Sequence, residues 1–498
     1  MYVEDHNKNG EEIDMVLEEH HRMFSERPRE EWTNKLEYLL SLVGYTVGLG
    51  SVWRFPYLCI KNGGGAFLIP FIIFTLLCGF PLFYLELALG QFSGKSALTT
   101  WSICPLFDGI GYSMIIASGI GAWYYCQVVG WVLLYLGYAF FPTQPWSTCS
   151  NDWNTDHCVV LRTGNEQVNY SDVNYSNFTK ASTQNDVFST AATEFWKYKL
   201  LNVSSGIDVL GSPQLQLAIA LFAAKLAIFL CLVKGVKSVG KVVYVTVIAP
   251  FALLLVLLVR SLWLDGSFDG VMLYLTPDFS RLAHYQVWLE AALQVFYSLG
   301  PIFGGVITMS SYQKFHGNIL RDTAVVVAAD LFSNFLCGLV IFSILGFLAH
   351  EAGLSVDEVA ESGPGLVFIV YPEVLQRLPL PHLWAVIFFF MLFTVGIDTQ
   401  IAFITAVVRF GGPEYKGYKY PDYTWIIGIC LAILPVLPIP LVASKRIYDS
   451  HGSLKQRLQK LIIPSPHWGP HGQCVRYEVY NYRGNFWQNV WTNLKGPR

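Results

Sequence analysis

The sequence predicts an all-α polytopic membrane protein, and three observations support this class. The chain has 498 residues, of which 53% are hydrophobic and 14% charged, with a mean hydropathy of +0.40. This composition is too apolar for an ordinary soluble protein. Runs of about 20 apolar residues recur along the chain, and each is long enough to cross a bilayer as a helix. Two of these runs are interrupted by glycine or proline at matching places in the two halves of the chain.

The apolar runs predict nine membrane-spanning segments. In chain order they cover residues 36–58, 66–90, 110–140, 214–233, 241–264, 287–310, 323–349, 382–408 and 423–443. The chain then divides into a polar N-terminal segment (1–34), a core of eight spans (35–410) with a long loop (141–212), a linker (411–422), the last span (423–443) and a basic tail (444–498). We see no cleavable signal peptide before the first span.

Loop charges predict the orientation. Basic residues gather in alternate short loops, which should be cytoplasmic; they are Lys95, Lys234, Lys237, Lys241, Lys314 and Arg321. We therefore expect a multi-pass plasma-membrane protein with a cytoplasmic N-terminus and an extracellular 141–212 loop. The net charge of −3 and the absence of a basic patch with interleaved aromatic residues argue against a nucleic-acid partner.

The long loop carries features of an extracellular segment. It contains four N-glycosylation sequons, at Asn169, Asn174, Asn177 and Asn202. Cys149 and Cys158 lie nine residues apart in the same loop, and in an oxidising compartment they are expected to form a disulfide.

The two interrupted spans predict a secondary transporter. The first contains Gly48 and Gly50, and the second contains Gly300 followed by Pro301. Helices lose backbone hydrogen bonds at such residues. Paired broken helices bind substrate and ions near the middle of the membrane in many transporters. Two kinked structural spans are the alternative.

Polar residues inside the spans predict a cation site. Thr46 and Ser51 offer oxygen ligands in the first broken span, while Asp330 and Asp398 are carboxylates in apolar surroundings. A buried carboxylate is costly unless it is paired or binds a cation, although a structural hydrogen bond could explain one of the two. Because the His and Cys spacing of a transition-metal site is missing, Na⁺ is the expected ion. We find no nucleophile paired with a base in the sequence, so nothing of this kind indicates an enzyme.

Several motifs closely resemble the neurotransmitter:sodium symporter family (solute carrier family 6). They include residues 48–50 and 52–57, 62–70, 86–91, 235–236, 362–366 and 396–398. The similarity covers about residues 29–410 and resumes at about 415–463. It implies the LeuT-type fold of two inverted five-helix repeats, and Na⁺-coupled uptake that is often Cl⁻-dependent.

The resemblance also implies two sodium sites. One consists of Gly44, Val47, Val395, Asp398 and Thr399, and the other of Thr46, Ser51, Ser298 and Asp330. In the second site the family usually has Asn at the positions of Ser51 and Asp330. A chloride pocket would consist of Phe71, Gln294, Ser298 and Asn334. Asp330 would repel an anion there, and Phe71 lacks the family's Tyr hydroxyl, so we expect weak or absent Cl⁻ dependence.

For the substrate, the resemblance implies a pocket for an amino acid or a GABA-like molecule. Gly48 replaces the Asp of monoamine carriers and leaves room for a substrate carboxylate. The implied lining residues are Tyr45, Gly48, Gly50, Gly121, Tyr125, Tyr297, Gly300 and Phe303, although a tight helix crossing would explain Gly121 equally well. Arg54 would serve the external gate, with an interfacial role as the alternative, and Arg29 with Trp32 would serve the internal gate near Ser311 and Tyr312.

The chain departs from the family in length. Family members have twelve spans, and the equivalents of spans nine to eleven are missing here, which removes the acidic partner expected for Arg54. The alternative function is therefore a non-transporting truncated isoform, or an incomplete gene model, of such a symporter. For such a form we expect poor surface delivery, no uptake, and an oligomer with itself or with a full-length form.

Overall fold

The computed structural model describes most of the chain. The described residues are 31–159, 189–204, 209, 211–232, 236–301, 303–315, 317–353, 355–356, 365–403, 414–415, 418–419, 433–465 and 468.

The first half contains the following elements in chain order: α2 (Lys35–Thr46), α3 (Leu49–Lys61), η1 (Gly65–Phe67), α4 (Leu68–Phe74), η2 (Thr75–Gly79), α5 (Phe80–Ser93), η3 (Thr100–Ile103), η4 (Pro105–Phe107), α6 (Gly109–Ala139), β1 (Cys158–Val159), β2 (Ser189–Thr190), α8 (Ala191–Glu194), η6 (Phe195–Leu200) and α9 (Leu215–Leu232).

The second half continues with α10 (Val236–Ser261), α11 (Ser267–Leu275), η7 (Phe279–Ala283), α12 (Tyr285–Leu299), α13 (Gly305–Ser310), α14 (Ile319–Ala352), η8 (Leu366–Val370), α16 (Tyr371–Leu375), α17 (Pro381–Phe403), β3 (Glu414–Tyr415), β4 (Tyr418–Lys419), α19 (Pro438–Asp449) and α20 (Leu454–Ile462). The two short strand pairs are β1–β2, which is parallel, and β3–β4, which is antiparallel.

Both predicted helix interruptions are present. The first separates α2 from α3, where Gly48 has an extended backbone (φ −112°, ψ 175°). The second separates α12 from α13, where Gly300 (φ 59°) and Gly304 (φ 78°) adopt left-handed conformations that favour glycine. Pro301 supplies no N–H between them.

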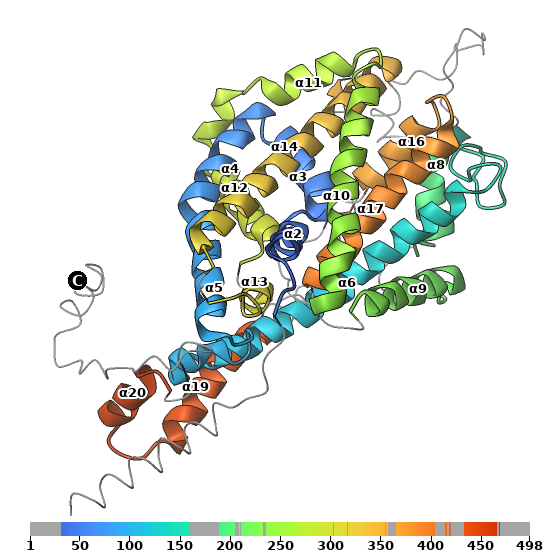
Figure 1. The fold of residues 1–498 in the computed structure, drawn as a ribbon. Helices are drawn as coiled ribbons and strands as arrows, with labels where there is room; N and C mark the ends of the chain where they lie inside the picture. Colours follow the sequence, from blue (N-terminus) through green and yellow to red (C-terminus); the bar gives the residue numbers. More distant parts are fainter. Residues whose placement is uncertain are drawn as a thin grey trace, which may run out of the picture.

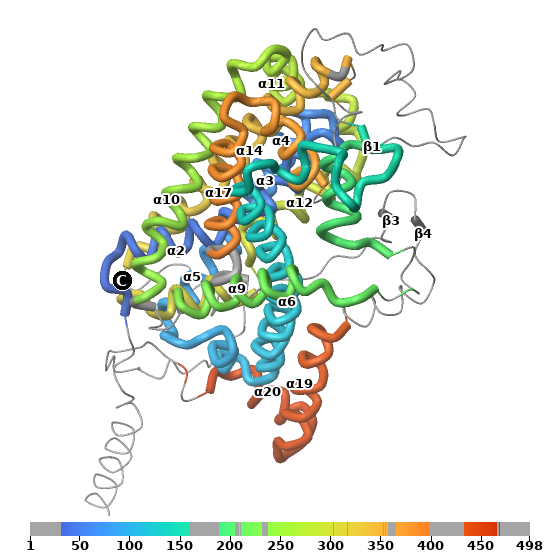
Figure 2. The backbone as a smooth tube through the Cα atoms, turned by 90° about the vertical axis from the view of Figure 1, so that its right-hand side faces the viewer, coloured from blue at the N-terminus to red at the C-terminus, as the bar shows by residue number. Residues whose placement is uncertain are grey.

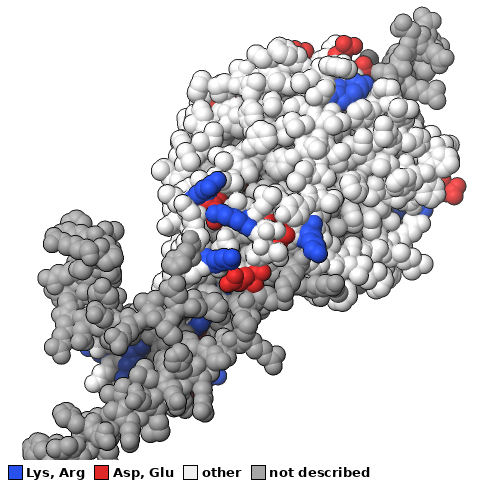
Figure 3. Space-filling view, viewed as in Figure 1, with Lys and Arg blue, Asp and Glu red and all other residues white. Residues whose placement is uncertain are grey.

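The described helices fit a polytopic membrane protein. Four are long and apolar enough to cross a bilayer, and they cover Gly65–Ser93, Pro105–Ala139, Ser238–Ser261 and Ile319–Glu351. Leu215–Cys231 and Pro381–Ile397 are shorter apolar helices at predicted spans. Much of the surface in Figure 3 is free of charge, and charged side chains gather over the region of α2, α5 and α13. The count of nine spans stays a prediction, because 404–413 and 420–432 lie outside the described residues.

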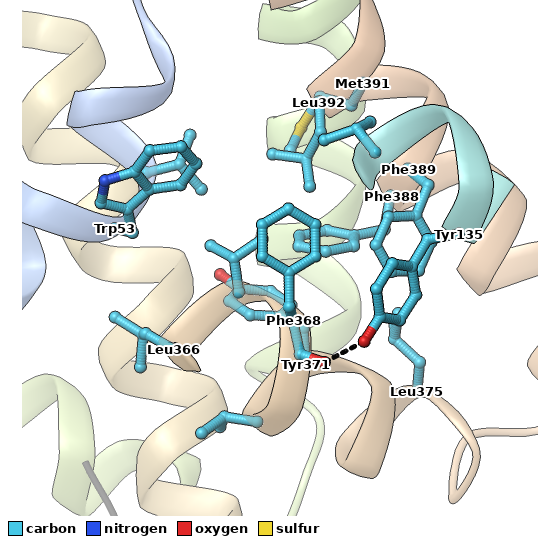
Figure 4. Packing of buried hydrophobic residues seen from close by; sticks show 14 of the residues in the cluster. Trp53, Tyr135, Leu366, Phe368, Tyr371, Leu375, Phe388, Phe389, Met391 and Leu392 are labelled. Carbon is cyan, nitrogen blue, oxygen red and sulfur yellow. Dashed lines mark hydrogen bonds between the residues drawn. The ribbon is translucent and has the colours of Figure 1, made fainter. Parts of the chain in front are cut away.

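The helices pack around two hydrophobic clusters. One lies among α2, α3, α5, α10, α12 and α14, while the other joins α6, α14 and α17 to the η8–α16 segment. In the second cluster the ring of Tyr135 stacks on Phe389 at 4.7 Å, and its hydroxyl donates to the carbonyl of Phe368 (2.7 Å; Figure 4). Leu366–Leu375, which the sequence did not predict as an element, is completely buried there. Figure 1 shows α11 lying across one end of α14.

The last predicted span, 423–443, stays a prediction, because the structure describes it only from residue 433. There a short helical stretch leads through Leu437, whose backbone is helical (φ −55°, ψ −38°), into α19, which begins at Pro438 and continues to Asp449. Pro438 lies in the first turn of α19, where proline is favoured. α19 and α20 pack beside the N-terminal end of α6 (Figure 2), where Arg446 forms an ion pair with Asp108 at 2.5 Å.

The disulfide predicted in the long loop is confirmed, and a buried carboxylate lies beside it. Cys149 is bonded to Cys158, and β1, which starts at Cys158, pairs with β2. The Glu194 side chain accepts hydrogen bonds from the side chains of Asn154, Thr155 and Ser189 and from the backbone N–H of Thr155. Burial raises the pKa of Glu194, but these hydrogen bonds outweigh it and hold the pKa below its ordinary value.

Glu194→Gln should therefore loosen this loop. An amide keeps one acceptor oxygen, so the hydroxyls of Thr155 and Ser189 must reorient to accept, and neutral hydrogen bonds replace those to a carboxylate, at a cost of about 1–3 kcal/mol. The measurement is the rate at which mild reductant exposes Cys149 and Cys158 to maleimide. Asp152→Asn is the control, because Asp152 is an exposed acid in the same loop. Equal rates for both variants and the parent chain would contradict the role of Glu194.

Candidate functional site

The two helix breaks lie against each other in the middle of the helical body. Tyr45, two residues before the gap in the first broken helix, donates its hydroxyl hydrogen to the carbonyl of Gly300 in the second (2.6 Å). The ring of Tyr297 lies so close to Gly50 that a Cβ there would stand 2.3 Å from its Cε1 atom. The two breaks therefore form one site, built by residues about 250 positions apart in the chain.

The start of α3 is the electropositive part of this site. Gly48 precedes the helix and has no capping side chain, and the N–H of Leu49 donates to the Tyr125 hydroxyl (3.2 Å). Helix N-termini carry partial positive charge and free N–H groups, which suit a carboxylate. Tyr125 is fully buried on α6, and Gly121 is buried one turn before it.

The remaining member of the predicted substrate pocket lies at the far side of the second break. Phe303 is half-buried, and its carbonyl accepts a hydrogen bond from Ser118 on α6 (3.2 Å). Hence α6 contacts both breaks, through Tyr125 at the first and Ser118 at the second.

A buried polar cluster adjoins the breaks on α12 and α14. Ser298 donates to Asp330 Oδ1 (2.6 Å), and the Asn334 amide donates to Asp330 Oδ1 (3.2 Å) and to Ser298 Oγ (3.2 Å). Asp330 is fully buried. Its Oδ2 atom and Asn334 Oδ1 have no hydrogen-bond partner within the described part of the chain. These hydrogen bonds satisfy only one carboxylate oxygen, so two buried oxygen atoms remain available as cation ligands.

The predicted chloride residues are only partly suited to an anion. Gln294 is fully buried one turn before Ser298, and neither atom of its carboxamide has a hydrogen-bond partner among the described residues. Phe71 packs against the ring of Phe55 (5.0 Å between centroids) and supplies no hydroxyl. Asp330 contributes a carboxylate to the same cluster, so an anion there would meet negative charge.

The other predicted sodium residues lie along α2, the start of α3 and α17. Thr46 and Ser51 are buried on either side of the first break, and the Thr46 hydroxyl donates to the carbonyl of Val43 (3.1 Å). Gly44 and Val47 are buried on α2 and in the gap, and α2 packs against α17, which carries the buried Val395. The side chains of Asp398 and Thr399 lie outside the described residues.

The predicted gate residues contact the second broken helix. The Arg54 guanidinium lies over the ring of Tyr297, 4.5 Å from its centroid. An aromatic face stabilises a desolvated guanidinium, so Tyr297 is a favourable contact for Arg54. Trp32 donates its indole N–H to the carbonyl of Met309 (3.0 Å) and its backbone N–H to that of Tyr312 (3.2 Å). Arg29 lies outside the described residues.

Sequence reasoning missed a polar cluster at the other end of the broken helices. Lys61, the last residue of α3, forms an ion pair with Glu290 on α12 (2.7 Å), and Asn62 and Gln286 donate to the same carboxylate (2.8 and 3.1 Å). Charged residues near span ends in both halves were the available signal, but a sequence separation of 229 residues gives no local indication of contact.

Comparisons with known proteins agree with this architecture. The model of the sodium:neurotransmitter symporter family matches residues 29–410. The sodium- and chloride-dependent glycine transporter 1 of Xenopus laevis is 40% identical over 424 residues, which cover 84% of this chain and 67% of that protein. The sodium- and chloride-dependent GABA transporter 2 of Rattus norvegicus is 44% identical over 382 residues, or 76% of this chain and 61% of that protein.

A third relative has a similar extent. The sodium- and chloride-dependent creatine transporter 1 of Mus musculus is 40% identical over 425 residues, which cover 84% of this chain and 66% of that protein. The chain thus spans about two thirds or less of the length of these relatives.

Gly300→Ala should weaken the contact between the breaks. At φ 59° a side chain is strained, and its Cβ would stand 2.7 Å from the Tyr45 hydroxyl oxygen, so we expect a loss of about 1–3 kcal/mol. The apparent melting temperature in detergent, followed by size-exclusion chromatography, should fall.

The matched control is Gly119→Ala. A Cβ at Gly119 on α6 meets nothing within 4 Å, and alanine favours a helix, so the melting temperature should stay constant or rise. If both variants melt like the parent chain, the contact between the breaks is not a significant stabilising interaction.

Proposed function

The chain belongs to the sodium:neurotransmitter symporter family, and from this premise we propose that it is a sodium-coupled symporter of an amino acid or an amino-acid-like neurotransmitter. We place it in the plasma membrane as a multi-pass protein. The observation that carries the proposal is the meeting of the two helix breaks, with Tyr45 bonded to Gly300 and Tyr297 lying against Gly50. Broken helices that meet in this way can bind a substrate and its driving ions together.

The proposed architecture is the LeuT-type fold of inverted repeats, with nine spans and a cytoplasmic N-terminus. The matching positions of the breaks, in α2–α3 and in α12–α13, support the repeat. The disulfide-bonded loop supports the orientation, because disulfides persist in oxidising compartments.

In the proposed substrate site, a carboxylate faces the start of α3. The glycines at 48 and 50 allow close approach to backbone N–H groups, and Tyr125 supplies a hydroxyl beside the N–H of Leu49. Tyr297 covers this position, and Arg54 lies on the outer face of its ring. Tyr45, Gly121, Gly300 and Phe303 complete the proposed pocket.

In the proposed ion sites, sodium is transported with the substrate. One site takes its ligands from Thr46, Ser51, Ser298 and Asp330, and the unpartnered Asp330 Oδ2 supports it. The other takes them from Gly44, Val47, Val395, Asp398 and Thr399. Hard oxygen ligands of this kind suit an alkali cation better than a transition metal.

A second candidate function is a non-transporting form that associates with itself or with a full-length symporter. It is favoured by a row of exposed apolar and aromatic side chains on one face of α6. Tyr112, Ile115 and Trp123 in this row are 51%, 49% and 80% exposed. Uptake of radiolabelled glycine, GABA and creatine into cells expressing the chain, with Na⁺ or choline outside, separates the two functions. Choline-sensitive uptake supports the symporter, whereas poor surface delivery together with no uptake of any of them supports the second function.

Asp398→Ala should abolish sodium-dependent substrate binding. In the proposed site the Asp398 carboxylate supplies the negative charge, and its loss leaves a bound cation with neutral ligands only. Binding is measured with radiolabelled substrate over a range of Na⁺ concentrations, in a chimera that adds family spans nine to eleven. Asp265→Ala is the control, because Asp265 is exposed outside the helices. An unchanged Na⁺ dependence in Asp398→Ala would refute this assignment.

Substrate uptake should depend weakly or not at all on Cl⁻. The Asp330 carboxylate already occupies the polar cluster with Ser298 and Asn334, and Phe71 offers no hydroxyl. Uptake in the same chimera should stay within about twofold when gluconate replaces Cl⁻, because a fixed carboxylate replaces the anion's charge. A fall to background would show that the cluster binds chloride in spite of Asp330.

A further inference from the structure

We propose that a groove between α10 and α17 binds a phospholipid, with the phosphate on Arg260 and an acyl chain along α10. The groove has a volume of about 460 Å³ and is lined by Leu255, Val256, Val259, Arg260, Trp263 and Trp384. This volume lies within the roughly 300–1,000 Å³ typical of ligand pockets. The proposal is independent of the symport activity.

Among the described residues that line this groove, Arg260 is the charged one. It is half-buried in the last turn of α10, and the ion pairs and side-chain hydrogen bonds described for this part of the chain do not include its guanidinium. The nearest acid in sequence, Asp265, is exposed and forms no described ion pair with it. The planar donors of a guanidinium match a phosphate group, which is the anion available at a membrane surface.

The rest of the groove is apolar and suits an acyl chain. Leu255, Val256 and Val259 form one stripe of α10 and remain 48%, 45% and 55% exposed. A soluble phosphate would leave this stripe uncovered, whereas a lipid covers it while its phosphate reaches Arg260. The occupant is therefore an amphiphile with an anionic group at one end.

The groove lies at the level of a membrane interface. Trp263 is 80% exposed at its rim, and Phe268, Phe279 and Tyr285 are exposed on the segments that follow α10 at the same end of the molecule (Figure 1). Aromatic residues gather at the level of lipid headgroups. The start of α17 meets the end of α6, where His382 contacts the carbonyls of Phe141 and Pro142, so the groove is on the side of the disulfide-bonded loop.

Both walls of the groove are held by hydrogen bonds. Ser261, next to Arg260, is bonded to Ser343 of α14 (2.6 Å), which fixes the end of α10. The Trp384 indole N–H donates to the carbonyl of Pro379 (2.9 Å), which fixes the ring on the opposite wall. The end of α10 and the Trp384 ring are therefore preformed, which lowers the cost of binding.

The test uses a phosphatidylcholine with a diazirine in its acyl chain, photoactivated in total membranes from cells that express the full chain. Surface delivery then does not affect the result. Mass spectrometry should find the cross-link on residues 255–263. Arg260→Gln should reduce it about tenfold per folded monomer, as expected for loss of a charge-assisted contact. Val259→Trp, which fills the groove and keeps Arg260, should reduce it as well.

Arg281→Gln is the matched control, because Arg281 is an exposed arginine outside the groove, and its labelling should equal that of the parent chain. Equal labelling of Arg260→Gln and Arg281→Gln would overturn the proposal. So would a cholesterol diazirine that labels residues 255–263 and is not displaced by excess phosphatidylcholine, because the occupant would then be a sterol.

Discussion

The structure depends on how two interrupted helices satisfy their backbone groups inside a membrane. Lipid offers no hydrogen bonds, so non-helical backbone at that depth must find its partners within the protein. The carbonyl of Gly300 receives the Tyr45 hydroxyl, and the N–H of Leu49 is bonded to the Tyr125 hydroxyl. Tyr45 lies on α2 and Tyr125 on α6. These bonds therefore require α2 to pack against the end of α12 and α6 to pack against the start of α3. The polar groups that stabilise the fold are thus the same ones that we propose as part of the substrate site.

The sequence predicted features that depend on local chemistry. Glycine and proline identified the two helix breaks, and two cysteines nine residues apart identified the disulfide. Long-range partners could not be predicted in this way. The pairing of Lys61 with Glu290 and of Trp32 with Met309 depends on how the helices pack, and no local pattern encodes it. The buried segment Leu366–Leu375 was missed because a run of ten residues that includes Pro372 and Glu373 is too short to indicate a span.

The cluster around Asp330 illustrates the limits of family resemblance. The resemblance predicted which positions come together, and Ser298, Asp330 and Asn334 are indeed hydrogen-bonded. The residue types nevertheless differ from the family, and they change the electrostatics: a carboxylate takes the place of an amide next to the pocket assigned to an anion. Physical reasoning about these side chains is therefore needed in addition to the alignment of positions, since charge determines which ions a buried site accepts.

The contacts along the two broken helices have a mechanical consequence. Trp32, before α2, is bonded to Met309 near the end of α13. Tyr45 on α2 is bonded to Gly300 after α12, and Glu290 on α12 is paired with Lys61 at the end of α3. A fragment of one broken helix therefore cannot tilt alone unless these bonds break. Displacements that keep these bonds move the joined fragments together, α2 with α13 and α3 with α12, and Gly300 lies where the two pairs meet.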